Sequence, residues 1–417
     1  MKLTMEKAVY GGDCLARDTS ASGNAGKTIA GKTVFIPLTL PGETVSAHII
    51  EEKRSFARAE ADEIVAASPQ RVTPQCPHFG ACGGCHYQHA EYAAQLGIKQ
   101  QILRETLARS GVAVPSEIGV LSGNPWGYRN RIRLALTQDG KPGYRGRRSH
   151  EIVPIRECPI AAPLLAEVAL NLASIIDPSD PRNDLAEIEL FTNHDGSELL
   201  VTFHLHSGNP IHRKLRFTPR YGSAHSQATR SKEDCLTYCV AGHDYRVSHG
   251  AFFQVNRWLL DGFVALVTAN RSGSLAWDLY AGVGLFTRPL AAHFARVLAV
   301  ESAPASFDAL QHNLAGTSGT AIGSTTLDFL RRNREQRESG PDLIVLDPPR
   351  AGLGEETTRL LNAIGAPEMV YVSCDPTTLA RDLRALTGER YKIEKITLVD
   401  MFPQTFHLET VVHLRRC

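Results

Sequence analysis

Cys374 and Glu409 are the residues of this sequence with the clearest potential for covalent chemistry. Cys374 follows the apolar run 369–372 and belongs to the tetrapeptide Ser-Cys-Asp-Pro, after which a helix is expected to begin. A strand that ends on this tetrapeptide points the thiol outward, toward the edge where loops build sites. We therefore interpret Cys374 as a nucleophile and Glu409, in the segment 402–409, as its partner. A structural cysteine near a helix start is the alternative interpretation.

A glycine-rich turn at 278–284 is the second candidate site. The sequence there reads Asp-Leu-Tyr-Ala-Gly-Val-Gly, and Glu301 closes the next predicted strand about 20 residues further on. Glycines let a ligand approach the backbone, and an acid at this distance binds ribose hydroxyls. The third glycine of the dinucleotide fingerprint is absent because Leu285 follows Gly284, which favours S-adenosylmethionine over NAD. A purely structural loop is the alternative.

Asp347 stands in the segment 346–350, which reads Leu-Asp-Pro-Pro-Arg. The two prolines make this loop rigid, and it follows a predicted strand. Parallel sheets bind ligands at the carboxyl edge of their strands, so Asp347 is predicted to lie in a ligand site. A helix-initiating turn without a functional role is the alternative.

Three cysteines, Cys76, Cys82 and Cys85, lie in a ten-residue segment rich in glycine and alanine, and Cys158 is a distant fourth. The chain has nine cysteines in what we expect to be a reducing compartment, so a disulfide framework is not expected. Four thiolates hold either an iron-sulfur cluster or a tetrahedral zinc ion. The spacing alone leaves both open, together with a chance grouping without metal.

The segment 129–148 is strongly basic, although the net charge of the protein is only +1. One acid, Asp139, lies among its basic residues, which are Arg129, Arg131, Arg133, Lys141, Arg145, Arg147 and Arg148. Trp126, Tyr128 and Tyr144 are interleaved with them. This pattern suits contacts to phosphates and stacking on RNA bases, and a solvated strand face is the alternative.

The elements that must position these residues fall into three predicted domains. A length of 417 residues, with 43% hydrophobic and 21% charged residues, is typical of a globular protein with two or three domains. Short β-rich runs at 33–36 and 44–50 predict a small barrel over residues 1–65. A central, mostly β domain is expected over 66–245, with a helix at 91–110 and an exposed loop at 222–233.

Alternating strands and helices predict a parallel α/β sheet over 246–417. Strands are expected at 275–279, 297–300, 343–346, 369–372, 393–399 and 410–414. We find no signal peptide and no run of 18 or more apolar residues, and therefore expect a cytoplasmic protein without a membrane segment.

Taken in order, these motifs resemble those of the RNA uracil-5-methyltransferase family, in particular its iron-sulfur members that modify 23S ribosomal RNA. The resemblance extends over essentially the whole chain. It implies that residues 1–65 form a TRAM domain, an RNA-binding barrel of OB-like character, and that residues 246–417 form a Rossmann-like class I methyltransferase domain. It also favours a [4Fe-4S] cluster over zinc, held by Cys76, Cys82, Cys85 and Cys158.

The resemblance assigns roles in the catalytic half. Cys374 matches the nucleophile of the family and Glu409 its general base. The residues that match its S-adenosylmethionine contacts are Gln254, Tyr280, Gly282, Gly284, Glu301 and Asp347. Leu285 departs from the family pattern, because an asparagine that touches the cofactor often stands there.

The implied reaction adds the Cys374 thiolate to C6 of a uracil, methylates C5 and removes the C5 proton through Glu409. This chemistry requires a lowered thiol pKa or a nearby proton acceptor for Cys374, and Glu409 is ionised at neutral pH if its pKa stays at about 4.3. We expect RNA as the partner, ribosomal RNA before transfer RNA, and a monomer. A non-catalytic RNA-binding iron-sulfur protein on the same scaffold and a cytosine-5 methyltransferase are the alternatives.

Overall fold

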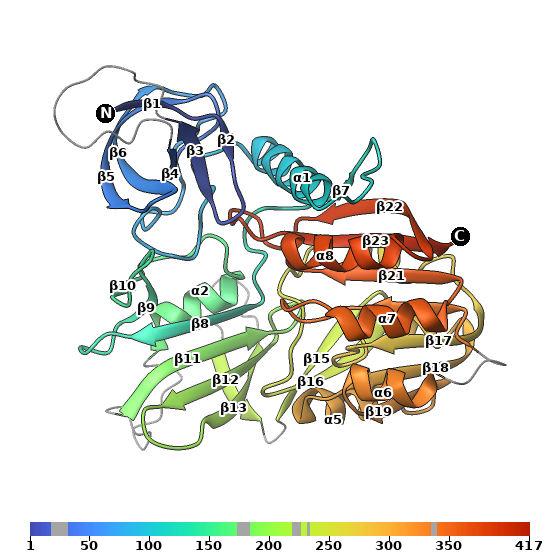
Figure 1. The fold of residues 1–417 in the computed structure, drawn as a ribbon. Coiled ribbons are helices and arrows are strands. Elements are labelled where there is room, and N and C mark those ends of the chain that lie inside the picture. The colour runs from blue at the N-terminus through green and yellow to red at the C-terminus, as the bar shows by residue number, and fades with distance from the viewer. Residues whose placement is uncertain (18–31, 173–183, 219–226, 232–233, 335–339) are drawn as a thin grey trace. The chain divides into compact units, whose positions relative to one another are not determined.

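The structure is a computed structural model that describes residues 1–17, 32–172, 184–218, 227–231, 234–334 and 340–417 (Figure 1). The chain forms two compact units. The first comprises Met1–Leu103, Arg145–Val153 and Phe402–His407, and the second comprises Arg104–Tyr144, Pro154–Met401 and Leu408–Cys417. Each unit is therefore assembled from segments that are far apart in the sequence.

The N-terminal part of the first unit is a six-stranded sheet with the strand order β1-β5-β6-β4-β3-β2. Its strands are β1 (Lys2–Thr4), β2 (Lys7–Ala8), β3 (Asp13–Arg17), β4 (Thr33–Pro37), β5 (Thr44–Glu52) and β6 (Phe56–Ala66). Alternate residues at the start of β4 and β5 are buried, because successive side chains of a strand point to opposite faces. Val34, Ile36 and Val45 belong to the resulting apolar core. The strands expected at 33–36 and 44–50 are therefore present.

The first unit also contains a loop from near the C-terminus, Phe402–His407, called the 402–407 loop below. Gln404 in this loop has a φ of 66°. Its carbonyl oxygen accepts the backbone N–H groups of His86 and Tyr87, at 2.7 and 3.0 Å. Gln95 of helix α1 (Tyr92–Arg109) exchanges two further hydrogen bonds with Gln404, at 2.9 and 3.0 Å. These contacts fix the 402–407 loop within the first unit.

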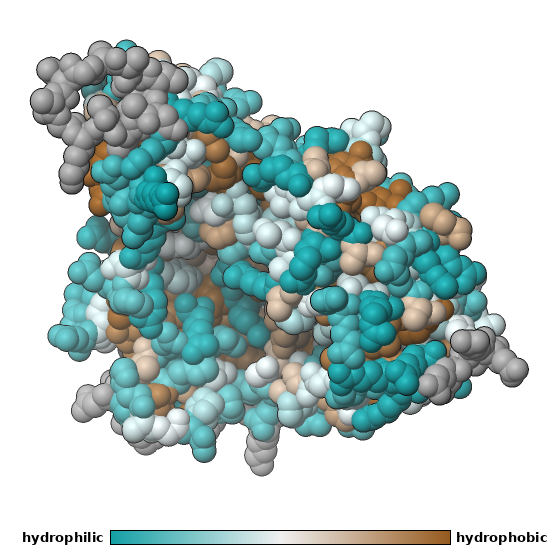
Figure 2. Space-filling model, in the orientation of Figure 1, coloured by the Kyte–Doolittle hydropathy of each residue, from teal (hydrophilic) through white to brown (hydrophobic). Residues whose placement is uncertain are grey.

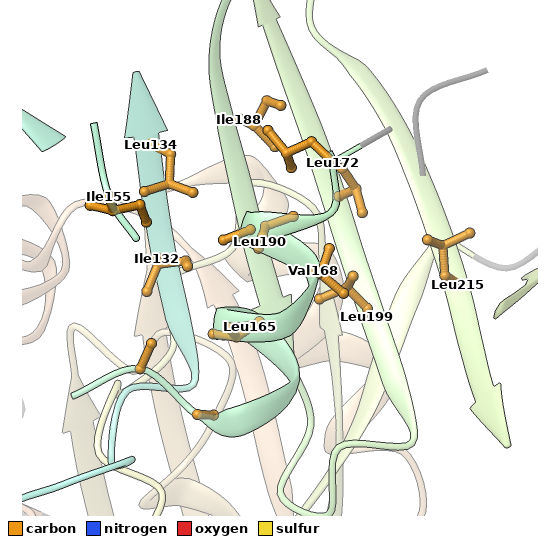
Figure 3. Packing of buried hydrophobic residues seen from close by; sticks show 14 of the residues in the cluster. Ile132, Leu134, Ile155, Leu165, Val168, Leu172, Ile188, Leu190, Leu199 and Leu215 are labelled. Atoms are coloured by element: carbon orange, nitrogen blue, oxygen red, sulfur yellow. The ribbon is translucent and has the colours of Figure 1, made fainter. Parts of the chain in front are cut away.

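A seven-stranded sheet with the order β10-β9-β8-β11-β12-β13-β14 packs against helix α2 (Pro163–Leu170). Its strands are β8 (Arg131–Leu136), β9 (Pro142–Arg145), β10 (Ile152–Pro154), β11 (Leu185–Thr192), β12 (Glu198–Leu205), β13 (Ile211–Thr218) and β14 (Gln227–Ser231). Leu165 and Val168 of α2 are buried in one cluster with strand residues such as Leu190 and Leu199 (Figure 3).

Strand β14 corrects one expectation from the sequence. An exposed loop was expected at 222–233, but residues 227–231 pair antiparallel with β13. The rest of that segment lies outside the described residues. A two-stranded sheet follows, formed by β15 (Cys235–Val240) and β16 (His243–Ser248).

An eight-stranded sheet with the order β19-β18-β17-β20-β21-β23-β22-β7 dominates the second unit. Its strands are β7 (Gly119–Leu121), β17 (Gly273–Leu279), β18 (Phe294–Glu301), β19 (Gly319–Gly323), β20 (Leu343–Leu346), β21 (Glu368–Ser373), β22 (Tyr391–Val399) and β23 (Glu409–Arg416). Strand β20 in the middle of this sheet is apolar throughout, and all of its residues are buried, because both faces of the sheet are covered there.

The helices of the second unit connect these strands. They are α3 (Leu260–Thr268), α4 (Thr287–Leu290), α5 (Pro304–Asn313), α6 (Thr326–Asn333), α7 (Glu355–Ile364) and α8 (Pro376–Thr387). Figure 2 shows a mostly hydrophilic surface over α6 and α7. Their apolar residues, such as Phe329 and Leu361, are buried. No helix among the described residues is long and apolar enough to cross a membrane.

The sheet confirms the six strands expected in the C-terminal part, and it differs from the expectation in two respects. It is not wholly parallel, because β23 runs antiparallel to both of its neighbours, β21 and β22. It also contains two strands that the sequence did not suggest. β19 pairs parallel with β18, and β7, from the region expected to belong to the central domain, pairs parallel with β22.

Candidate active site at the carboxyl edge of the eight-stranded sheet

The predicted site residues of the C-terminal half converge on one edge of the eight-stranded sheet. Tyr280 follows β17, Glu301 ends β18, Asp347 follows β20 and Cys374 follows β21. These strands are parallel neighbours in the sheet, so their carboxyl ends share an edge. Glu409 starts the antiparallel strand β23 and therefore lies at the same edge.

Cys374 and Glu409 are placed opposite each other by the register of β21 and β23. The last aligned pair of this ladder is Ser373 with Thr410. One further step in an antiparallel register brings Cys374 opposite Glu409. The predicted nucleophile and its predicted partner are therefore neighbours across two strands.

Helix α8 begins directly after Cys374, as the proline at 376 indicated. Asp375 is its N-cap, and one carboxylate oxygen accepts the backbone N–H groups of Thr377 and Thr378 at 2.9 and 3.0 Å. Burial, together with the charges of Glu409 and Asp347, nevertheless raises the pKa of the Cys374 thiol to about 12. Of the two possibilities expected for Cys374, a lowered thiol pKa is not found, because burial and two acids outweigh Arg350, and a nearby group that can accept a proton is present in Glu409.

Glu409 is buried, with 3% of its surface exposed. Burial and the neighbouring Asp347 raise its pKa well above the usual range, while Arg350 lowers it. Burial and Asp278 likewise raise the pKa of Asp347. The condition for an ionised Glu409 at neutral pH, an ordinary carboxyl pKa, is therefore not met. The acids in this site favour their protonated forms because they are close together and removed from water.

The two glycines of the glycine-rich turn have different surroundings, because one borders open space and the other is packed against a side chain. Tyr280 adopts a φ of 65°, Gly282 of 56° and Gly284 of 91°. A Cβ atom on Gly282 would have no neighbour within 4 Å, whereas one on Gly284 would lie 2.9 Å from Cδ1 of Leu310. Gly282 thus borders space that a ligand can enter, and Gly284 is required by the packing of the turn.

Glu301 is held against this turn by backbone N–H groups. Its Oε2 atom accepts N–H of Gly282 at 2.9 Å, and its Oε1 atom accepts those of Ser302 and Ala303 at 2.7 and 2.6 Å. A carboxylate has about four lone-pair positions for acceptance. One position on Oε2 is therefore left for a hydroxyl group, as ribose recognition requires.

Gln254 is buried in the segment between β16 and α3. Asn130, a fully buried residue that the sequence analysis missed, donates from Nδ2 to the Gln254 carbonyl at 2.9 Å. Leu285 is also buried, and its carbonyl oxygen accepts the hydroxyl of Tyr245 at 3.0 Å. Leu285, which departs from the family pattern, therefore packs beneath the turn, where its backbone carbonyl accepts a hydrogen bond. No sequence signal distinguishes Asn130 from other asparagines.

Asp278 belongs to the glycine-rich motif, but nothing in its sequence context indicates a role for it. It is completely buried, and burial raises its pKa to about 7. Its Oδ2 atom accepts the hydroxyl of Thr287, while Oδ1 has no hydrogen-bond partner. Arg350 was likewise quoted only as part of its motif, although its charge acts on both Cys374 and Glu409.

The cysteines of the predicted cluster lie in both compact units. Cys76, Cys82 and Cys85 belong to the first unit and Cys158 to the second. Cys82 Sγ accepts the N–H of Gly84 at 3.4 Å. Cys158 Sγ lies 3.8 Å from the hydroxyl of Tyr144. Within the parts of the chain that the structure describes, no three His, Cys, Asp or Glu side chains are grouped to hold a metal ion.

Five basic side chains of the segment 129–148 are paired with acids, four of them with acids from elsewhere in the chain and one with Asp139 of the same segment. These pairs are Arg131 with Glu189, Arg133 with Glu187, Lys141 with Asp139, Arg147 with Glu60 and Arg148 with Asp13. Tyr128 is completely buried and is not available to stack on a base. Burial therefore excludes Tyr128 as a stacking residue, and acids of distant strands pair with arginines such as Arg133 and Arg148, while contact of this segment with RNA stays a prediction.

Comparison with known proteins identifies the family. A model of the tRNA (Uracil-5-)-methyltransferase family matches residues 233–417, and a TRAM domain model matches residues 12–61. The 23S rRNA (uracil(1939)-C(5))-methyltransferase RlmD of Edwardsiella ictaluri is 34% identical, over 95% of this chain and 94% of that protein. The enzyme of the same name from Pectobacterium atrosepticum is 36% identical, over 91% and 88%.

A solved structure agrees with these relatives. The tRNA (uracil-54, C5)-methyltransferase of Pyrococcus abyssi, in complex with S-adenosyl-L-homocysteine, is 26% identical and superposes with a TM-score of 0.74. The match covers 99% of this chain and 100% of that one. The N-terminal TRAM barrel and the C-terminal methyltransferase fold are thus confirmed, and the chain belongs to the RNA uracil-5-methyltransferase family.

Proposed function

We propose that this protein transfers a methyl group from S-adenosylmethionine to C5 of a uridine in 23S ribosomal RNA. The observation that carries the proposal is the cross-strand placement of Cys374 and Glu409 beside Asp347 at the carboxyl edge of the sheet. The names of the bacterial relatives support ribosomal RNA as the substrate. Transfer RNA is the alternative, favoured by the substrate of the solved relative.

In the proposed reaction, the Sγ atom of Cys374 forms a bond to C6 of the uracil. The electron pair of the C5=C6 bond moves toward O4, which makes C5 nucleophilic. C5 then takes the methyl group, while the electrons of the broken sulfur–methyl bond remain on the donor sulfur. Glu409 accepts the C5 proton, the C5=C6 bond re-forms, and the bond to Cys374 breaks to release the thiolate.

Both groups must lose a proton before they can act, because burial and the neighbouring acids favour their protonated forms. When bound, S-adenosylmethionine supplies the methyl group and a positive charge. A positive charge close to these acids lowers the pKa of Cys374, Glu409 and Asp347. Arg350 and the start of helix α8 act in the same direction, so we propose that the thiolate forms mainly after the methyl donor has bound.

Gln254, Tyr280, Gly282, Gly284, Glu301 and Asp347 are the proposed contacts of the methyl donor. The open space beside Gly282 and the remaining acceptor position of Glu301 support a ribose-containing ligand at the turn. We assign Gly284 an indirect role, because its absent side chain accommodates Leu310. The base that is methylated must leave its stack to reach the thiol, which an unpaired loop of RNA allows at lower cost than a duplex.

We further propose that Cys76, Cys82, Cys85 and Cys158 hold a [4Fe-4S] cluster. Support comes from the four thiols themselves and from the backbone N–H of Gly84, which donates to Cys82 Sγ at 3.4 Å, since hydrogen bonds to the sulfurs are typical of such clusters. Such a cluster would stabilise the cysteine-rich segment, and the methylation steps do not pass through it. Iron and sulfide analysis of anaerobically purified protein tests this assignment.

We place the protein in the cytoplasm, where ribosomal RNA is modified, and propose that it acts as a monomer on RNA held partly by the TRAM domain. Light scattering of the purified protein tests the monomer. Mapping 5-methyluridine in total RNA from a deletion strain separates the two substrates. Loss of the modification from 23S ribosomal RNA supports the proposal, and loss from transfer RNA alone replaces it by the alternative.

Trapping with RNA that contains 5-fluorouracil tests the chemistry. Fluorine cannot leave C5 as a proton, so the bond between Cys374 and C6 should persist and the complex should survive a denaturing gel. Cys374→Ala should give no such complex. Cys417→Ala is the matched control, because Cys417 is exposed at the C-terminus and should leave trapping unchanged. Absence of a complex with unaltered protein that still binds S-adenosylmethionine would contradict the mechanism.

A further inference from the structure

Asp382 of helix α8 is a buried carboxylate for which the proposed chemistry has no use. Only 1% of its surface is exposed. Its Oδ2 atom accepts the hydroxyl of Tyr371 at 2.8 Å and the backbone N–H of Leu353 at 2.7 Å. Asp382 thereby connects the strand that leads to Cys374 with the segment 350–353, which follows Asp347.

Two further side chains of α8 bind the same segment. Arg381 donates to the Ala351 carbonyl at 2.8 Å and pairs with Asp382 Oδ1 at the same distance. Thr378 donates from Oγ1 to the carbonyl of Arg350 at 3.1 Å. The segment 350–353 is thus held to α8 along its length by side chains of one helix.

Gly352 shows how closely the segment approaches the helix. A Cβ atom at this position would lie 2.5 Å from Asp382 Oδ2 and 2.7 Å from an Arg381 nitrogen. The φ of Gly352 is 73°, which side chains rarely adopt. Glycine at 352 is therefore required both by the backbone conformation and by the contact with Asp382.

This attachment matters because Arg350 opposes the acids of the site. The groups that act on the Cys374 thiol are Glu409 on β23, Asp347 after β20 and the guanidinium of Arg350. Arg350 also acts on Glu409. Its side chain is on an exposed stretch of chain, so its position relative to the thiol depends on what holds the backbone of 350–353.

We propose that Asp382 is a positioning residue that, by fixing the segment 350–353 to helix α8, holds the Arg350 guanidinium where it favours the thiolate of Cys374. Asp382 does not touch the reacting atoms. This inference rests on the proposed function for its purpose, since it assumes that Cys374 must ionise during the reaction. The competing view is that Asp382 only stabilises the packing of α8 on the sheet.

Alkylation of Cys374 by iodoacetamide distinguishes these views without RNA or methyl donor. The rate is measured between pH 7.5 and 9.5, at roughly constant ionic strength, by mass spectrometry of the peptide that contains Cys374. Below the thiol pKa, the rate follows the thiolate fraction, which falls about tenfold for each unit that the pKa rises. We expect Asp382→Asn to lower the rate by about tenfold, because the amide cannot pair with Arg381 and the segment loosens.

Three further variants supply an independent disruption of the segment 350–353, a conservative replacement and a control. Thr378→Val removes the contact with the Arg350 carbonyl, together with two longer contacts of the same hydroxyl to Asp375 at 3.4 and 3.5 Å, and should lower the rate several-fold with little effect on folding. Asp382→Glu, which retains the charge, should recover part of the loss. Glu394→Gln removes an exposed carboxylate of β22 that pairs with Arg415 at 2.7 Å, and its rate should stay within about twofold of the unaltered protein.

The direction of the change separates positioning from general destabilisation. Loss of packing would expose Cys374 and accelerate alkylation, whereas displacement of Arg350 slows it. An unchanged or faster rate in both Asp382→Asn and Thr378→Val would overturn the inference. A failure of 5-fluorouracil trapping in the unaltered protein would contradict the proposed function instead, since the alkylation measurement does not depend on it.

Discussion

Replacement of Asp278 by asparagine should make the protein less sensitive to rising pH. Burial raises the folded-state pKa of Asp278 from 3.8 to about 7. Because the folded-state value is the higher one, folding favours the protonated acid, and stability falls as pH rises from about 4 to about 7. A shift of about three units corresponds to about 4 kcal/mol, at 1.36 kcal/mol for each unit. Above about pH 7 this contribution no longer changes.

The Asp278→Asn variant lacks this titration. Its amide oxygen still accepts the Thr287 hydroxyl, while its NH₂ group occupies the place of Oδ1, which has no partner. At pH 5 we therefore expect the variant to equal the unaltered protein or to be less stable. Between pH 5 and 8, the difference in unfolding free energy should change in favour of the variant by up to about 3 kcal/mol.

Urea unfolding, followed by the fluorescence of the tryptophans, measures this difference at pH 5, 6, 7 and 8. Trp277 is buried next to Asp278 in β17 and reports on the same strand. Glu356→Gln is the matched control, because the side chain of Glu356 reaches solvent and its pKa is lowered by Arg331, so it stays ionised over this range. A difference between Asp278→Asn and the unaltered protein that is constant within about 0.5 kcal/mol would refute the assignment of a raised pKa.

Three further predictions concern the turn, the proton balance and the central core. Gly282→Ala should weaken binding of S-adenosylmethionine, measured by calorimetry, with only a small decrease in Tm. Gly284→Ala should lower Tm markedly, as thermal unfolding would show. Binding of S-adenosylmethionine at pH 7 should release more protons than binding of S-adenosylhomocysteine, which lacks the sulfonium charge, because that charge favours ionisation of Glu409 and its neighbours. Calorimetry in buffers of different ionisation enthalpy measures the number of protons released, and equal release would contradict the prediction. Leu165→Ala, in the fully buried core of α2, should cost about 2–5 kcal/mol of unfolding free energy in urea.

The positions of the site residues could be predicted because short turn-forming motifs follow the buried strands in the sequence. Apolar runs end on a glycine-rich turn after Leu279, on two prolines after Leu346 and on Ser-Cys-Asp-Pro after Val372. Parallel strands then bring such ends to one edge without any knowledge of distant contacts. The sheet places Tyr280, Asp347 and Cys374 there for this reason.

The environment of the same residues could not be predicted, since it depends on pairings between distant segments. Arg133 meets Glu187 and Arg148 meets Asp13 only after strands of different regions have paired. A count of charges within one segment therefore overstated its basic character. The raised pKa of Glu409 likewise follows from burial beside Asp347, and the local sequence around Glu409 or Asp347 does not indicate that the two lie close together.

Strand β7 limits where the chain can be divided if the methyltransferase domain is to be produced on its own. The family match begins at residue 233, yet Gly119–Leu121 forms an edge of the sheet next to β22, and the Leu121 carbonyl accepts the N–H of Asp400 at 2.8 Å. A fragment cut before 233 would leave the backbone of 397–399 unpaired at an open edge, a template for self-association. Gln404 would also lose Gln95, its partner on α1. Residues 233–417 are therefore not expected to be stable as a separate fragment. Chimaeras within this family should exchange residues 119–121 together with residues 233–417.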